Sequence, residues 1–205
     1  MTNGPELWTK ILARMPEGSI VAGGAVRDFL IGVEPKDIDV FCSSKNFATP
    51  EGFTALPESE RNGEYDAMSE IDVVHHGELE GYPVDLVFMN IEPFNAQTLV
   101  EIFDVSTAQC WFDGECHAYA AAAGDLAEGL VTVLRYERLP RTIERFERFN
   151  ARHDGRFQLI VDQSQVVGLD EFDFVPFEAP VLTAEQTEED RLRDEDEALM
   201  PGGFN

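Results

Sequence analysis

The segment VAGGAVRDFLIGVEPKDIDVF, residues 21–41, constrains the fold more than any other part of the sequence. Its apolar start predicts a short buried strand that ends at Gly23 and Gly24, and AVRDFLIG predicts a short helix directly after them. DIDVF then alternates charged and apolar residues, as a half-buried strand does. Glycine lets a ligand approach the backbone closely, and the carboxylates of Asp37 and Asp39 project to one face of a strand. The segment therefore predicts an α/β fold that carries a functional site.

The rest of the chain continues this mixture of strands and helices. Residues 71–89 and 108–120 are predicted to form two strand pairs, and residues 43–70 a long surface loop. Further helices are predicted over residues 5–15, 93–103, the first part of 121–133, and 139–153. In the last of these, apolar side chains at Ile143, Phe146 and Phe149 are expected on one face, and arginines on the opposite sides, at Arg141, Arg145, Arg148 and Arg152.

The composition limits the partners that the chain can have. Forty acidic residues against 15 basic ones give a formal net charge of −25, which repels nucleic acid at long range. A role with RNA must therefore rest on a local basic patch. No apolar run approaches the roughly 18 residues that a membrane helix needs. Because the N-terminus also lacks the build of a signal peptide, a cytoplasmic protein is expected, with Cys42, Cys110 and Cys116 as reduced thiols.

The distribution of charge also suggests two parts. Residues 1–160 are expected to form one domain that ends with the basic helix. Residues 161–205 are expected to form an acidic extension, partly mobile, in which the 36 residues from Asp170 onward hold 12 acidic residues and two arginines. A solvated segment is the favoured interpretation of this extension, and a binding element is the alternative.

Three aspartates on predicted strands form the candidate chemical centre: Asp37, Asp39, and Asp85 in YPVDLVF. Carboxylates from two neighbouring strands would form a cluster of acidic oxygens, and such a cluster needs a cation because like charges repel. All-oxygen ligands select a hard divalent ion such as Mg²⁺, which commonly keeps positions open for substrate phosphates. Two such ions can activate an attacking hydroxyl and neutralise a leaving pyrophosphate.

The glycine pair fits the same chemistry. Gly23 and Gly24 lie where a strand ends and a helix begins, and backbone N–H groups and the helix dipole favour phosphate there. Arg27, one turn into the predicted helix, would add a charged donor to a triphosphate, unless it pairs with Asp28. The segment thus predicts glycines for a nucleoside triphosphate (NTP) and aspartates for its metal ions.

These residues resemble the head-domain signature of the class II tRNA nucleotidyltransferases and bacterial poly(A) polymerases, in the polymerase-beta-like nucleotidyltransferase superfamily. That signature reads Gly-Gly-x-Val-Arg-Asp, a short apolar helix, Gly, and Asp-x-Asp, and GGAVRDFLIGVEPKDIDVF contains each element. The resemblance implies a mixed sheet with helices packed on one side. It also implies two Mg²⁺ ions held by Asp37 and Asp39, with Asp85 as the third acidic residue.

The resemblance continues more weakly as far as Phe157. Of the family motif Arg-Arg-Asp-Phe-Thr-Ile-Asn-Ala, which helps to hold the nucleotide sugar, this chain keeps Asp104 and Ser106 but neither arginine. A later motif of spaced arginines is kept as Arg145 and Arg148, before Phe149. Because these 205 residues are few for such a protein, the helical regions that hold tRNA in that family are not expected among them.

The function that these observations favour is transfer of a nucleoside monophosphate (NMP) from an NTP to an acceptor hydroxyl, with release of pyrophosphate. An RNA 3′ end of tRNA-like type is the acceptor that the resemblance implies, and a bacterium or a phage is the expected source of a small protein of this kind. Transfer to a protein or to a small molecule remains an alternative. A non-enzymatic protein whose acidic surface mimics nucleic acid on a protein partner is a further alternative.

Overall fold

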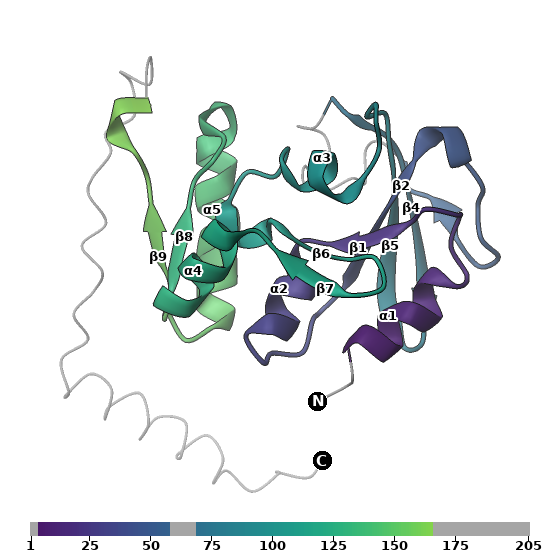
Figure 1. Cartoon of the computed structure of the whole chain (residues 1–205), viewed down its shortest axis with the longest axis horizontal. Coiled ribbons are helices and arrows are strands. Elements are labelled where there is room, and N and C mark those ends of the chain that lie inside the picture. The colour runs from purple at the N-terminus through teal and green to yellow at the C-terminus, as the bar shows by residue number, and fades with distance from the viewer. Residues whose placement is uncertain (1–3, 58–68, 166–205) are drawn as a thin grey trace, which may run out of the picture. The chain divides into compact units, whose positions relative to one another are not determined.

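The computed structural model describes residues 4–57 and 69–165, which combine helices with a mixed β-sheet (Figure 1). The acidic extension predicted at 161–205 lies outside the described residues from residue 166 onward. Among the described residues, no helix combines the length and the apolar character that crossing a membrane requires.

A seven-stranded sheet positions the predicted site. Its strands lie in the order β3-β4-β5-β2-β1-β6-β7. Strands β2 and β5 pair in parallel, and the other pairs in this sheet are antiparallel. The mixed sheet expected from the sequence is therefore confirmed. The strands are β1 (Ile20–Ala22), β2 (Ile38–Ser43), β3 (Thr54–Ala55), β4 (Ile71–Leu79), β5 (Tyr82–Met89), β6 (Cys110–Phe112) and β7 (Cys116–Ala118).

Five α-helices accompany this sheet in the described part of the chain: α1 (Gly4–Leu12), α2 (Gly24–Leu30), α3 (Ala96–Val100), α4 (Ala120–Glu128) and α5 (Leu139–Arg152). Helices α1 and α2 pack on one face, where Trp8 and Val26 join Val40 and Leu86 in one buried cluster. The short helix α3 packs on the other face, because its Leu99 lies in a second cluster with residues of β2 and β5 (Figure 1). Helices therefore cover both faces, with the longer α1 and α2 on one side.

A smaller element stands beside the main sheet. Strands β8 (Leu130–Thr132) and β9 (Gln158–Ile160) pair in parallel, and α5 connects them. Val131, Phe149 and Phe157 form a third buried cluster there. The described residues also form four short 3₁₀ turns: η1 (Ser44–Asn46), η3 (Ser106–Ala108), η4 (Tyr136–Arg138) and η5 (Gln163–Gln165).

The buried face of α5 differs from the face that the apolar pattern predicts. Thr142 and Phe149 are buried, whereas Ile143 and Phe146 are only half-buried. Arg145, predicted on the opposite side, lies at the border of this buried stripe: the residue is exposed, but its guanidinium reaches Asp104. The reason is a polar contact: Asp104 is buried, and α5 turns a hydroxyl and a guanidinium toward its carboxylate.

Candidate active site

Asp39 and Asp85 lie side by side on the two parallel strands at the centre of the sheet. The register pairs Asp39 of β2 directly with Asp85 of β5, so both side chains point to one face at the strand spacing of about 4.8 Å. Both carboxylates are half-buried. Two positions further along the same face, Phe41 and Val87 are buried in the second core cluster. The pair therefore stands at the border between the apolar core and solvent.

Asp37 lies just before β2 begins and takes a different position. Its side chain is 56% exposed, and its Oδ2 lies 3.9 Å from Nζ of Lys36. Within residues 4–57 and 69–165, no group of three or more His, Cys, Asp and Glu residues is arranged to hold a metal ion. The facing carboxylates of Asp39 and Asp85 are nevertheless the all-oxygen donors that suit Mg²⁺. The assignment of Asp39 and Asp85 as the ligands of such an ion stays a prediction, as does the participation of Asp37.

The glycine turn lies at the same end of the sheet as these carboxylates. Because the antiparallel register pairs Val21 with Val40, the next residue of β1, Ala22, lies beside Asp39. Gly23 follows with φ 76° and ψ −130°, a backbone conformation that favours glycine, and its N–H donates to the Cys110 carbonyl at 2.9 Å. Gly24 then begins α2. The turn and the carboxylate pair are thus neighbours in space.

Arg27 is held over this turn by two partners. Its Nε donates to Oδ1 of Asp28 at 2.8 Å, and Nη2 lies 2.7 Å from the same oxygen. The guanidinium also stacks on Phe149 of α5, with Cζ 4.1 Å from the ring centroid. Burial lowers the pKa of Arg27, and the Asp28 carboxylate opposes this change. A Cβ at Gly24 would lie 3.6 Å from Nη2, so the guanidinium lies next to the start of α2.

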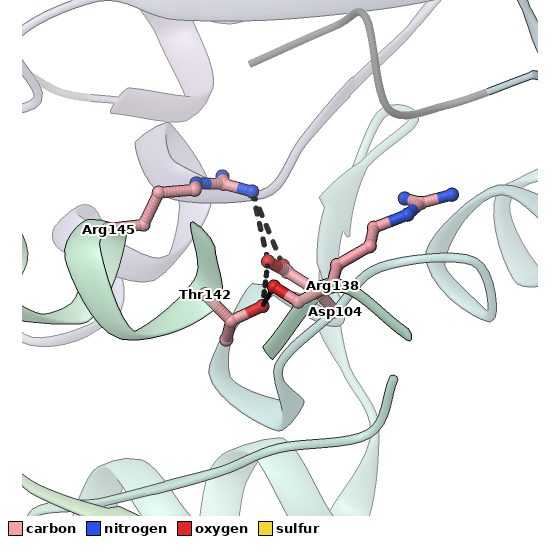
Figure 2. A network of polar contacts seen from close by, with 4 residues as sticks. All are labelled: Asp104, Arg138, Thr142 and Arg145. Carbon is pink, nitrogen blue, oxygen red and sulfur yellow. Dashed lines mark hydrogen bonds and ion pairs between the residues drawn. The ribbon is translucent and has the colours of Figure 1, made fainter. Parts of the chain in front are cut away.

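Asp104 joins α5 to the chain segment after α3 (Figure 2). Thr142 Oγ1 donates to Asp104 Oδ2 at 3.0 Å, and Arg145 Nη1 donates to the same oxygen at 3.2 Å. Thr142 Oγ1 also contacts the Arg138 carbonyl at 3.1 Å, while the Arg138 guanidinium points away from Asp104 (Figure 2). The neighbouring residue Phe103 lies within 3.7 Å of a Cβ placed on Gly23, so this network lies near the glycine turn.

Two residues of the predicted motifs have other surroundings. Ser106 Oγ donates to the Asp125 carboxylate and accepts from the Thr132 N–H at 3.0 Å, so it ties η3 to α4 and β8. Arg148 is exposed on α5, away from the buried stripe of that helix. The structure thus brings Gly23, Gly24, Arg27, Asp104 and Arg145 into one region, with Asp39 and Asp85 at the adjoining end of the sheet.

One residue of this region was not selected from the sequence. His76 of β4 pairs with Asp85 in the sheet register, and its Nδ1 lies 2.7 Å from Asp85 Oδ1. Its neighbour His75 points to the opposite face and is buried between Phe47 and Phe88. The missing signal was the register of the β4–β5 hairpin, since only that register places His76 beside an aspartate.

The three cysteines of the chain are free thiols in the described structure. Burial raises the pKa of Cys110 to about 12, so this thiol is not a nucleophile near neutral pH. His117 lies near Cys116 on β7 but contacts Asp113 instead, with Nε2 3.2 Å from Oδ1. Burial also raises the pKa of Cys42 and Cys116, so none of the three thiols is an activated nucleophile near neutral pH.

No protein-family model matches the sequence, and no curated protein matches it. The structure is similar to that of a Thermotoga maritima CCA-adding enzyme complexed with tRNA, with 19% identity, a TM-score of 0.50, and coverage of 79% of this chain and 39% of that chain. A CCA-adding enzyme with CTP matches with 21% identity and a TM-score of 0.52, over 77% of this chain and 39% of that one.

An apo form of a CCA-adding enzyme gives a similar result, with 20% identity, a TM-score of 0.50, and coverage of 80% of this chain and 39% of that chain. This chain therefore spans 39% of the length of these three enzymes. At sequence identities of 19–21%, the similarity to these structures is evidence for a shared fold alone. The described residues thus share the fold of the matching part of CCA-adding enzymes, which confirms at the level of the fold the resemblance to the head of class II tRNA nucleotidyltransferases.

Proposed function

We propose that this protein is an Mg²⁺-dependent nucleotidyltransferase that moves an NMP from an NTP to an acceptor hydroxyl and releases pyrophosphate. The observation that carries the proposal is the pairing of Asp39 with Asp85 at the end of the sheet where the Gly23–Gly24 turn leaves β1. A carboxylate pair beside a glycine turn suits the transfer of a phosphoryl group, because cations and backbone N–H groups both stabilise phosphate charge.

Each part of the site has a role in this reaction. Bound Mg²⁺ would neutralise charge on the triphosphate and on the attacking oxygen. Asp39 and Asp85 would hold the ion, and Asp37 is proposed as the further ligand that the sequence motif indicates. The N–H of Gly24, at the start of α2, is proposed to face the triphosphate, and Gly23, whose own N–H donates to the Cys110 carbonyl, is proposed to let the phosphates approach the backbone. Arg27 would add positive charge, since Asp28 and Phe149 hold its guanidinium beside the start of α2.

The second group of residues is proposed to bind the nucleoside. Asp104 is buried, and its carboxylate is fixed by Thr142 and Arg145, so the loop after α3 has one orientation relative to α5. A carboxylate of this kind accepts hydrogen bonds from sugar hydroxyls. Arg145 keeps a side chain that is 44% exposed while it contacts Asp104, and it is proposed with Arg148 as a contact to the nucleotide.

An RNA 3′ end is the acceptor that we propose. Two solved structures that share the fold are CCA-adding enzymes, one complexed with tRNA and one with CTP, which supports an NTP and an RNA as the two substrates. The net charge of −25 favours a short contact with RNA over an extended one, because few arginines face many carboxylates.

The test is transfer of a labelled NMP. The full chain is incubated with each α-labelled NTP, Mg²⁺ and short RNAs with a free 3′ hydroxyl, and the labelled product is resolved by size. We expect extension of RNA by the unmodified protein and none by Asp39→Ala. Asp113→Ala serves as the matched control, because Asp113 lies on the β6–β7 turn and its side chain is 44% exposed. Equal activity of Asp39→Ala and the unmodified protein would overturn the assignment.

The same assay separates the acceptor classes. If the label appears on protein in a cell extract and not on RNA, the proposed nucleotidyl transfer is correct, but its acceptor is a protein. A protein that binds no NTP and transfers no label with any acceptor would support the alternative of an acidic interaction protein.

A further inference from the structure

Four neighbouring strands carry polar side chains that form one row across the sheet. The register pairs Thr54 of β3 with His76 of β4, His76 with Asp85 of β5, and Asp85 with Asp39 of β2. Directly paired residues on neighbouring strands point to the same face. The two proposed metal carboxylates are therefore part of a longer polar row that includes His76.

His76 contacts Asp85 directly. Its Nδ1 lies 2.7 Å from Asp85 Oδ1, and the side chains of His76 and Asp85 are 50% and 26% exposed. Because a carboxylate oxygen is a hydrogen-bond acceptor, we assign the proton of this contact to Nδ1, with the imidazole as the donor. One oxygen of Asp85 is thus fixed by a ring on the neighbouring strand.

The backbone fixes the position of that ring. Strands β4 and β5 are joined by a two-residue turn, Glu80 and Gly81, whose φ angles are 54° and 83°. Such a turn sets the hairpin register, and from Leu79 opposite Tyr82 the pairing runs to His76 opposite Asp85. A slip of one residue would move His76 to the other face. His76 is therefore held beside Asp85 by the fold itself.

We infer that His76 is a positioning residue for the carboxylate pair. By donating to Oδ1 of Asp85, it fixes the orientation in which Asp85 and Asp39 face a divalent cation. Two carboxylates at neighbouring positions repel each other, and a donor to one of them limits the rotation that would separate them. The inference rests on the proposed function, because the cation is the one proposed for nucleotidyl transfer.

The experiment measures binding of Mn²⁺ to the full chain by water-proton relaxation, without nucleotide. Three variants are compared with the unmodified protein: His76→Leu removes the donor, His76→Asn keeps an amide N–H where Nδ1 was, and Glu78→Gln is the control. Glu78 is exposed and lies two residues further on the same face of β4. We expect His76→Leu to raise the Mn²⁺ Kd by about tenfold or more. His76→Asn should restore most of the affinity, and Glu78→Gln should leave the Kd unchanged.

Asp39→Ala distinguishes the failure of this inference from that of the proposed function. If Asp39→Ala weakens Mn²⁺ binding and His76→Leu does not, the positioning role is wrong and the carboxylate site stands. If Asp39→Ala leaves Mn²⁺ binding unchanged, the proposed metal site is wrong and the role of His76 falls with it. Should His76→Leu fail to fold, His76→Gln replaces it, because the longer glutamine places its amide where Nε2 was. Equal Kd values for His76→Gln and His76→Asn would then overturn the inference.

Discussion

At the scale of the residue, a buried ion pair determines how Arg27 is presented. The sequence predicts a phosphate contact for Arg27 and leaves pairing with Asp28 as the alternative. In the structure the side chains of Arg27 and Asp28 are only 12% and 4% exposed, and the guanidinium stacks on Phe149. The pair therefore joins α2 to α5, and a guanidinium held in this way loses little freedom when an anion binds beside it.

Removal of Asp28 is expected to destabilise the fold. Asp28→Ala leaves the buried guanidinium of Arg27 without its carboxylate, and breaking a buried pair from one side costs about 3–5 kcal/mol. Urea unfolding of the variant should therefore show a free energy of unfolding lower by about this amount. Asp113→Ala, at an exposed position, should change it little. Equal stability of the two variants would contradict a structural role for the Arg27–Asp28 pair.

Histidine burial gives a prediction about pH. His75 is buried between Phe47 and Phe88, and burial lowers its pKa. The unfolded state therefore binds a proton at His75 more readily than the folded state does. The stability that neutral His75 contributes is fully present above the ordinary His pKa of about 6.5, and it is lost as pH falls toward the lower pKa of the folded state. His75→Phe removes the group that titrates. The variant should lose less stability than the unmodified protein between pH 7.5 and about pH 5, measured by urea unfolding at each pH. Parallel pH profiles would refute this origin.

At the scale of the element, the β4–β5 hairpin shows what local patterns can predict. Two strands around Gly77 and Gly81 follow from alternation and composition; the structure has both strands, but Gly77 lies within β4 and only Gly81 is in the turn. The sequence did not determine the register, because the turn consists of Glu80 and Gly81 at positive φ instead of a typical Asn-Gly pair. With that register known, His76 would have been predicted opposite Asp85.

The face of α5 is the second case in which the pattern was insufficient. Apolar spacing favoured Ile143, Phe146 and Phe149 as the buried face. The structure buries Thr142, whose hydroxyl contacts the buried Asp104, and Arg145 reaches the same carboxylate with a side chain that stays 44% exposed. Asp104 lies far from α5 in the sequence, so a periodicity within the helix contains no information about this contact.

The hairpin turn also predicts a stabilising substitution. Glu80 has φ 54°, in the left-handed region, where most residues with a side chain are less stable by about 1–2 kcal/mol. Asparagine tolerates this conformation and forms the favoured Asn-Gly turn with Gly81. Glu80→Asn should therefore raise the free energy of unfolding by several tenths up to about 1 kcal/mol. Glu78→Asn removes the same charge from the adjoining strand and should not stabilise; an equal gain in both variants would mean that charge, and not the turn, is the cause.

At the scale of the whole molecule, charge is distributed unevenly. Seven of the 15 basic residues lie between residues 135 and 156, in a chain with a net charge of −25. Several of these arginines already face carboxylates: Arg138 lies 4.0 Å from Glu70, and Arg145 lies 3.2 Å from Asp104. An RNA that binds along α5 would therefore make few new phosphate contacts. Its affinity should depend only weakly on salt, since the slope follows the number of phosphates neutralised.

The acidic C-terminal residues, which lie outside the described structure, give the last prediction. Residues 184–205 hold eight acidic residues and two arginines, and their field opposes the approach of a polyanion. Deletion from Ala184 onward should therefore strengthen binding of a short RNA. The gain should be largest at low ionic strength, because exposed charges are screened beyond about 10 Å at 0.1 M salt. Fluorescence anisotropy at several salt concentrations measures the Kd.

A neutralised variant is the matched control, in which the eight acidic residues become Asn or Gln and the length is kept. If charge is the cause, this variant and the deletion should bind RNA equally well. If only the deletion binds better, the length of the segment obstructs the RNA, and if both bind less well, these residues belong to the acceptor site. Thermal unfolding of the deletion variant separates these effects from folding: the expected Tm is unchanged, and a large fall would show that residues 184–205 stabilise the domain.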